Sequence, residues 1–300
     1  MREFAEPFRH GWRQAVEVRA TLVDFQSPFQ RIQVLDTVPF GRMLVLDDAA
    51  QTAEAEEYVY HEMLVHVPLL AHPDPRRVLI IGGGDGGALR RVLAHPVTLA
   101  RQVEIDGDVV RLSRELLPSI SAGAYDDPRA DAVIGDGVAH LRDTAERYDV
   151  LLIDSTDPVG PAVELFGDAF YRDARRALGG TGLLVTQSGS PLVMLDELKA
   201  ARALLARHFP IVRTYVCSIP AYPGVLWSFT AASEAIDPAR IDQAAARSQL
   251  RALGVPTGYY TSAVHAAAFA LPNFLRAALE MDDDGDPAPL PPPVPGQPPR

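Results

Sequence analysis

The hydrophobic pattern of the first sixty residues differs from that of the rest of the chain. β-branched and aromatic residues alternate with polar ones, and turn-forming residues divide this region into three segments, at 16–25, 29–35 and 42–46. This pattern predicts a small antiparallel sheet. Tyr60, Met63, Leu64 and Val67 then follow helical spacing, which predicts a helix over 56–70.

Beyond this helix, short runs typical of buried strands alternate with helical patterns. The runs lie at 78–81, 100–105, 132–134, 150–153 and 183–186. Amphipathic segments lie between or after them, at 87–94, 108–117 and 192–208. Continuous apolar strands separated by helices indicate a parallel, doubly wound sheet covered by helices on both faces. We therefore expect an α/β protein with a Rossmann-like, methyltransferase-type sheet preceded by a small antiparallel β domain.

The predicted organisation has three parts. Residues 1–55 form an N-terminal β-stranded domain, 56–280 a Rossmann-like catalytic domain, and 281–300 a tail. The last twenty residues contain eight prolines and four aspartates. Proline lacks a backbone donor and fixes φ, so this stretch is expected to be a disordered, solvated tail, with a ligand for a proline-binding module as the alternative.

Composition and charge narrow the classes of function. The chain has 300 residues, a formal net charge of −11 and a single cysteine. An acidic surface is unsuited to nucleic acid or anionic membrane but suits cationic small molecules. One cysteine excludes a disulfide framework. Without a signal peptide or an apolar stretch long enough to span a bilayer, a cytoplasmic protein is expected.

A glycine-rich segment follows the first buried run. Gly82, Gly84 and Gly87 fit the spacing G-x-G-x-x-G, which permits a tight turn and a close approach of the backbone to a nucleotide-like ligand. A plain turn can have the same spacing. The next run ends in Glu104 and Asp106, and an acid at this place can accept both ribose hydroxyls. Together these features predict a nucleoside-binding site.

The charge of Asp85 bears on which nucleoside is bound. This carboxylate lies within the glycine loop, where it would repel a pyrophosphate or the carboxylate of S-adenosylmethionine and attract an ammonium group. Decarboxylated S-adenosylmethionine ends in an ammonium group, so Asp85 favours that compound. The alternative is an aspartate that only caps the following helix. Asp136, in Gly135-Asp136-Gly137, can accept the adenine amino hydrogen, or it can belong to a simple turn.

Two carboxylates follow the fourth buried run. Asp154 and Asp157 are three residues apart on a loop at the ligand-binding edge of such sheets, which suggests a cation subsite or a general base. An alkyl ammonium becomes a nucleophile only after it loses a proton, and a carboxylate can accept that proton. In-line attack on the methylene beside the sulfonium would then transfer an aminopropyl group.

With these residues in place, the chain closely resembles the polyamine aminopropyltransferases, or spermidine synthases, over about residues 4 to 280. The matching segments are 58–63, 78–87, 103–106, 125–129, 154–162, 219–223 and 259–274. The family fold is an N-terminal β domain followed by a Rossmann-like domain. Its members are usually dimers or tetramers and need no metal, so the resemblance implies a homodimer or homotetramer.

The resemblance also implies roles for individual residues. Asp154 would be the proton acceptor, and Asp85 would hold the aminopropyl ammonium. The nucleoside would be held by Gln33, Glu104, Asp136, Gly137 and Pro161, with Gln51 near the sulfonium. The polyamine would meet Tyr60, His61, Asp157, Gln187 and Tyr222, with Glu6 a loosely aligned acid for the distal amine. Decarboxylated S-adenosylmethionine is then a co-substrate, putrescine the acceptor, and spermidine and 5′-methylthioadenosine the products.

The sequence departs from the family pattern in four places. The usual T-E-R-D-E-F reads A-E-A-E-E-Y at 53–58, and the usual L-D-G reads L-D-D at 46–48. Val163-Glu164 replaces the family's Glu-Ser, and 221–225 read A-Y-P-G-V. Three of these changes are expected near the acceptor, whose identity they leave open: cadaverine, agmatine and spermidine are the alternatives to putrescine.

Two other functions compete with this hypothesis. An amine N-methyltransferase that uses intact S-adenosylmethionine could share the scaffold, and a polyamine-binding module could have lost turnover. A zinc site at His61 and His66 is disfavoured because histidines five apart do not share a helix face. We expect Cys217 to be a small buried apolar residue and His265 to be structural.

Overall fold

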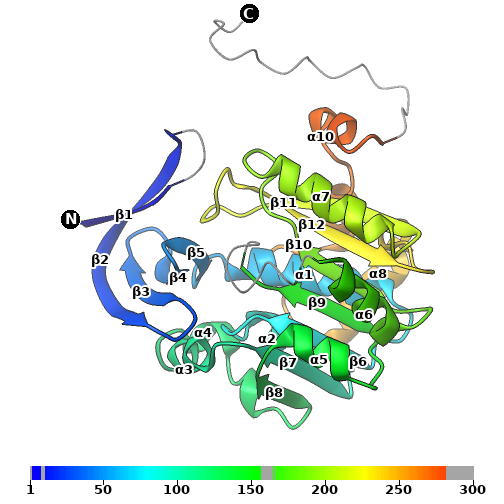
Figure 1. Ribbon diagram of the computed structural model, residues 1–300, viewed down its shortest axis with the longest axis horizontal. Coiled ribbons are helices and arrows are strands. Elements are labelled where there is room, and N and C mark those ends of the chain that lie inside the picture. The colour runs from blue at the N-terminus through cyan, green and yellow to red at the C-terminus, as the bar shows by residue number, and fades with distance from the viewer. Residues whose placement is uncertain (1, 8–10, 157–164, 166, 282–300) are drawn as a thin grey trace, which may run out of the picture.

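The computed structural model describes residues 2–7, 11–156, 165 and 167–281. Two sheets lie side by side, a curved N-terminal sheet and a larger α/β body (Figure 1). Of the predicted tail at 281–300, residues 282–300 lie outside the described residues. Among the helices that are described, none has the length and apolar character needed to cross a membrane.

The N-terminal sheet has five antiparallel strands in sequence order: β1 (Arg2–Pro7), β2 (Arg13–Gln26), β3 (Arg31–Thr37), β4 (Gly41–Leu46) and β5 (Ala49–Ala53). The three predicted segments correspond to β2, β3 and β4. The alternation pattern did not predict β1 and β5, because β1 has a single buried residue, the polar Glu6, and β5 consists of small and polar residues. The register of β2 against β3 shifts twice, once between Val18 and Ala20 and once between Thr21 and Val23. Such bulges bend a strand.

The second sheet has seven strands in the order β11-β12-β10-β9-β6-β7-β8. Its five predicted strands are all present and parallel: β6 (Arg77–Gly82), β7 (Leu99–Glu104), β8 (Ala130–Ile134), β9 (Val150–Asp154) and β10 (Leu183–Gln187). An antiparallel hairpin, β11 (Ile211–Ser218) and β12 (Leu226–Ser233), extends one edge and was not predicted. Ser228 and Thr230 interrupt the apolar pattern of β12, yet both are fully buried, because hydrogen bonds to Gly189 and Ser188 satisfy their hydroxyls.

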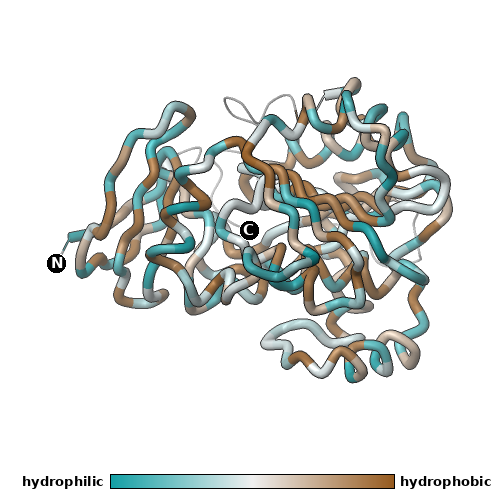
Figure 2. The backbone as a smooth tube through the Cα atoms, turned by 90° about the horizontal axis from the view of Figure 1, so that it is seen from below, coloured by the Kyte–Doolittle hydropathy of each residue, from teal (hydrophilic) through white to brown (hydrophobic). Residues whose placement is uncertain are grey.

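Helices cover both faces of this sheet. They are α1 (Glu57–Ala71), α2 (Gly87–Leu93), α3 (Gly107–Leu116), α4 (Pro118–Ser121), α5 (Gly137–Asp143), α6 (Asp168–Leu178), α7 (Leu195–Ala206), α8 (Gln243–Leu253), α9 (Ser262–Ala268) and α10 (Asn273–Ala278), with short 3-10 turns η2 (Ala124–Asp126) and η4 (Pro238–Arg240). In β6, Val78 and Ile80 pack with α1 and α2, whereas Leu79 and Ile81 pack with α5 and α6. Burial on both faces explains the apolar runs of β6, β9 and β10, and Figure 2 shows brown strands at the centre of the body. The run at 132–134, in the edge strand β8, is exposed instead.

The helix α1 is buried along nearly its whole length. Its Glu62 carboxylate accepts hydrogen bonds from the backbone N–H groups of Gly258, Tyr259 and Tyr260, at 2.8, 2.9 and 2.7 Å. One side chain thus joins the start of the α/β body to a segment almost two hundred residues later.

Buried histidine and cysteine side chains occur at three further places in the fold. His265 bonds the Tyr260 hydroxyl at 2.7 Å and the Pro238 carbonyl at 2.8 Å, and Cys217 is a buried free thiol. Both are as expected from the sequence. His66 and His95 form a buried pair, with 2.9 Å between Nδ1 of the first and Nε2 of the second.

Candidate active site

A cavity of about 390 Å³ opens at the carboxyl ends of the parallel strands, where the N-terminal sheet meets the α/β body. Some of its lining residues come from the N-terminal sheet and its loops, and others come from the ends of β6, β7, β9 and β10. Of the residues predicted for the site, the cavity is lined by Glu6, Gln51, Tyr60, Asp85, Glu104, Asp136, Gly137, Asp154, Gln187 and Tyr222. Residues far apart in sequence are thus brought to one place.

The glycine loop packs so closely on its surroundings that a side chain at either end of it would collide with a neighbour. Gly82 has φ +85°, and a Cβ there would lie 2.1 Å from the backbone oxygen of Asp154. A Cβ on Gly87 would lie 2.2 Å from the imidazole of His61. The loop therefore runs directly against the residues that flank it, and the Gly83 N–H donates to the Asp154 carbonyl at 2.8 Å. This packing fixes the distance between the loop and the end of β9.

One end of the cavity has the features of a nucleoside site. Burial raises the pKa of Glu104 to about 7, and its Oε1 accepts the Asp106 N–H at 2.9 Å. Asp136 caps α5 by accepting the Val138 N–H at 2.8 Å, and its side chain also lines the cavity. Apolar side chains such as Ile81 and Val103 lie beside these acids. A flat apolar ring with adjacent hydroxyls would fit such a lining.

Asp154 is the central acid of the cavity. The Tyr60 hydroxyl donates to its Oδ1 at 2.7 Å, while its Oδ2 is buried and has no hydrogen-bond partner in the described structure. Burial, followed by the charge of Asp85, raises the pKa of Asp154 to about 6, although His61 and Tyr60 oppose the rise. A carboxylate with one oxygen held and the other unoccupied is suited to accept a proton from a ligand near neutral pH.

Asp85 is fixed by its surroundings. Its Oδ1 accepts the Gly87 N–H at 2.6 Å and lies 3.4 Å from Nε2 of His61. Asp85 therefore does bond the start of α2, as the helix-capping alternative predicted. Its side chain also lines the cavity. A single aspartate both fixes the loop and adds negative charge beside Asp154.

The other end of the cavity lies between the two sheets. The Ala50 N–H donates to Oε2 of the buried Glu6 at 3.0 Å, and the Tyr222 hydroxyl donates to the Gln51 carbonyl. Gln187 is held by its own loop, where its Oε1 accepts the Gly189 N–H at 2.9 Å. Polar groups from β1, β5 and the segment after β11 therefore meet around one end of the space.

Four of the predicted residues do not line the cavity or cannot be placed. Gln33, on β3, donates to Asp24 at 3.1 Å and is not a lining residue. His61 is 1 % exposed and lies behind Asp85. Asp157 and Pro161 lie outside the described residues, as do Val163 and Glu164.

Sequence reasoning missed two aromatic side chains of the cavity, Phe29 and Trp227. Trp227, on β12, lines it and packs edge-to-face on Tyr222 with 4.6 Å between ring centroids. Its Nε1 is buried without a hydrogen-bond partner among the described residues. Because β12 itself was not predicted, no signal placed this indole near the site.

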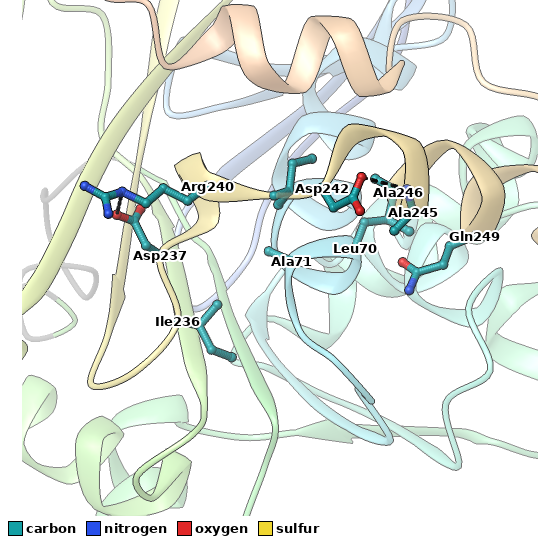
Figure 3. A pocket seen from close by; sticks show the side chains of 10 residues that line it. Leu70, Ala71, Ile236, Asp237, Arg240, Asp242, Ala245, Ala246 and Gln249 are labelled. Atoms are coloured by element: carbon teal, nitrogen blue, oxygen red, sulfur yellow. Dashed lines mark hydrogen bonds and ion pairs between the residues drawn. The ribbon is translucent and has the colours of Figure 1, made fainter.

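A second cavity, of about 320 Å³, lies between the end of α1, η4 and the start of α8 (Figure 3). Its charged side chains are already used within the protein. Asp237 pairs with Arg213 at 2.7 Å and with Arg240 at 3.4 Å, and Asp242 caps α8. This arrangement indicates a structural crevice.

Within the described ranges, no group of three or more His, Cys, Asp and Glu side chains is arranged to hold a metal ion. His61 and His66 have separate hydrogen-bond partners. His61 bonds Glu57 at 2.7 Å, and His66 bonds His95 at 2.9 Å.

Comparisons with known proteins agree with this geometry. Residues 57–242 match the spermine/spermidine synthase domain, and residues 2–54 match the spermidine synthase tetramerisation domain. The polyamine aminopropyltransferase of Desulforudis audaxviator is 47 % identical over 91 % of this chain and 97 % of its own length. That of Bacillus subtilis is 42 % identical over 88 % of this chain and 94 % of its own.

Solved structures give the same result. A spermidine synthase in complex with the transition state analogue AdoDATO superimposes with a TM-score of 0.89 at 37 % identity, covering 93 % of this chain and 95 % of its own. The spermidine synthase of Thermotoga maritima gives 0.87 at 37 % identity, with coverages of 93 % and 94 %. The chain therefore belongs to the spermidine synthase family of polyamine aminopropyltransferases.

Proposed function

We propose that this enzyme transfers the aminopropyl group of decarboxylated S-adenosylmethionine to putrescine, giving spermidine and 5′-methylthioadenosine. The observation that carries the proposal is the charge of the cavity. Six carboxylates line it, and the described lining residues include no Lys, Arg or His. The lining carboxylates are Glu6, Asp47, Asp85, Glu104, Asp136 and Asp154. Such a site favours a sulfonium and ammonium groups and disfavours a donor that carries a carboxylate.

The nucleoside of the donor is assigned to the end that holds Glu104. There, Glu104 accepts hydrogen bonds from the ribose hydroxyls, while Asp136 and Gly137 face the adenine, and Pro161 belongs to the same subsite by resemblance. Gln51 lies toward the sulfonium. Gln33 stays assigned to this subsite by resemblance alone, since in this structure it is bonded to Asp24.

The reacting groups meet between Asp85 and Asp154. Asp85 binds the ammonium of the aminopropyl arm, and the acceptor amine approaches Oδ2 of Asp154. The amine nitrogen forms a bond to the methylene beside the sulfonium, the C–S bond breaks, and its electron pair remains on the sulfur of methylthioadenosine. The proton that the nitrogen loses passes to Asp154.

The acceptor amine is assigned to the end between the sheets. Tyr60, Gln187 and Tyr222 border the space, and Glu6 supplies a negative charge for the distal ammonium. Asp157 is assigned to the same amine by resemblance. The matched tetramerisation domain over 2–54 supports a homo-oligomer, a dimer or tetramer, which light scattering on the purified protein would measure.

The test is release of methylthioadenosine from decarboxylated S-adenosylmethionine with putrescine, cadaverine, agmatine and spermidine in parallel. Release fastest with putrescine supports the proposal, whereas a preference for another amine moves the acceptor. No release with any amine, together with tight binding of intact S-adenosylmethionine, would replace it by an N-methyltransferase.

The variant Asp154→Asn keeps the side-chain shape but cannot accept the proton. We expect turnover to fall by orders of magnitude, while calorimetry still detects binding of the donor. Turnover close to that of the native enzyme would refute Asp154 as the proton acceptor.

A further inference from the structure

A row of buried charges leads from α2 to the cavity. Arg91 lies 3.0 Å from Oε1 of Glu57, and the other oxygen of Glu57 lies 2.7 Å from Nδ1 of His61. Nε2 of His61 lies 3.4 Å from Oδ1 of Asp85. The residues thus alternate in sign, with Asp85 alone of the four lining the cavity.

His61 cannot easily change its position in this row. It is 1 % exposed, and its ring fills the space that a side chain on Gly87 would need. Both ring nitrogens face carboxylates, an arrangement in which both act as donors only in the imidazolium form. Burial alone would lower the pKa of His61, but Asp85, followed by Glu57, raises it well above its usual value.

Asp85 is oriented by this arrangement. Its Oδ1 receives the Gly87 N–H as well as the His61 contact, and no donor among the described residues pairs with Oδ2. The same imidazolium lies close enough to Asp154 to favour the ionised form of that carboxyl as well. One cation behind the cavity therefore acts on both carboxylates at which the reaction is placed.

We propose that Glu57 is a positioning residue, which holds His61 as an imidazolium that orients Asp85 and keeps Asp154 ionised beside it. This role rests on the proposed function of Asp85 and Asp154. It gives His61 a role through Asp85, beside the polyamine contact that the resemblance implies for it. Arg91 balances the charge of Glu57, so that the row can stay buried.

Other charged groups around His61 do not replace Glu57. Those that face it come from α1, the glycine loop, α2 and the end of β9: Glu56, Glu57, Tyr60, Asp85, Arg90, Arg91 and Asp154. Of these, only Glu57 is bonded to Nδ1. Without the Glu57 carboxylate, the His61 ring would keep Asp85 on one side but would have the guanidinium groups of Arg90 and Arg91 near the other. The imidazolium would then lose its proton more easily.

The variant Glu57→Gln tests the role, with Glu62→Gln as its matched control. Both remove a buried carboxylate from α1, but Glu62 bonds the 258–260 backbone and not His61. In wild type, NMR of His61 should show a ring that stays protonated well above the usual imidazole pKa. In Glu57→Gln we expect the ring to lose its proton at a clearly lower pH than in wild type, whereas in Glu62→Gln it should behave as in wild type.

The second readout is the pH dependence of kcat/KM. The acid limb of Glu57→Gln should shift upward by roughly one pH unit, because Asp154 loses the nearby cation. Glu62→Gln should lower stability without shifting that limb. A ring that stays protonated in Glu57→Gln, or a limb that does not move, would overturn the proposal.

These readouts separate this inference from the proposed function. The His61 titration needs no turnover, so it decides the role of Glu57 even if no amine is a substrate. If Glu57→Gln does not fold, the wild-type titration decides alone, since a His61 ring that loses its proton in the usual imidazole range would refute the assignment.

Discussion

Replacing Tyr60 by phenylalanine isolates one hydrogen bond of the active site. The Tyr60 hydroxyl donates to Oδ1 of Asp154 at 2.7 Å, and this bond favours the ionised carboxylate. The ring of Tyr60 packs on Phe229 and Tyr222, with centroid distances of 5.2 and 5.8 Å. Because Tyr60→Phe keeps the ring, the packing stays and only the hydroxyl is lost.

The size of the effect follows from the energy of a hydrogen bond to a charged group. Such a bond contributes roughly 1.5–3 kcal/mol, which is about one to two pKa units. The pKa of Asp154, raised to about 6 mainly by burial and by Asp85, should then rise further in the variant. A rise of that size moves the acid limb of kcat/KM to roughly pH 7–8.

The assay is release of methylthioadenosine between pH 5 and 10. Asp154 accepts a proton only when ionised, so the variant should lose about two- to tenfold at pH 7 and recover toward pH 9. Tyr222→Phe is the control, because its hydroxyl bonds the Gln51 carbonyl and its loss should leave the acid limb in place. A Tyr60→Phe limb that stays near pH 6, or moves below it, would refute the reasoning.

Two predictions concern stability. Burial lowers the pKa of His95 from 6.5 to about 4, so between these pH values the folded state binds fewer protons than the unfolded state. The free energy of unfolding should therefore fall as the pH drops from 6.5 to 4, with a contribution of about 3 kcal/mol from this residue. His95→Gln should therefore reduce the slope of melting temperature against pH in this window, and an unchanged slope would assign the acid sensitivity elsewhere. Val225 is β-branched, has φ +64° and is 43 % exposed, so Val225→Gly should relieve backbone strain and stabilise the protein by about 0.5–1 kcal/mol. A melting temperature below that of wild type would show that the valine side chain contributes more than its backbone strain costs.

The parts of the fold that the sequence predicted are those in which one physical cause dominates. Residues 78–81 are buried on both faces, so their pattern is continuous and indicates a parallel strand. The hairpin of β11 and β12 escaped prediction because Thr230 and Ser228 are buried with their hydroxyls satisfied by groups distant in sequence. Such long-range hydrogen bonds leave no local signal.

The site shows the same limit. Motif spacing placed Asp85 and Asp154 correctly at the cavity, because the ends of parallel strands meet at one edge of the sheet. Spacing says nothing about which way a neighbouring side chain turns. His61 follows Tyr60 directly, yet Tyr60 lines the cavity and His61 lies behind it. The partner that holds His61, Glu57, is recognisable only once the row of charges is seen in three dimensions.

During synthesis of the chain, α1 is complete long before its deepest carboxylate can be satisfied. Glu62 is 1 % exposed, and the N–H groups that it accepts follow it by 196 to 198 residues. Until those residues leave the ribosome, burying α1 would leave a carboxylate with only Arg91, 4.0 Å away, to offset its charge. The nascent protein should therefore keep this apolar helix accessible to chaperones until residues 258–260 have emerged, and a ribosome stalled before residue 258 should display it to proteases.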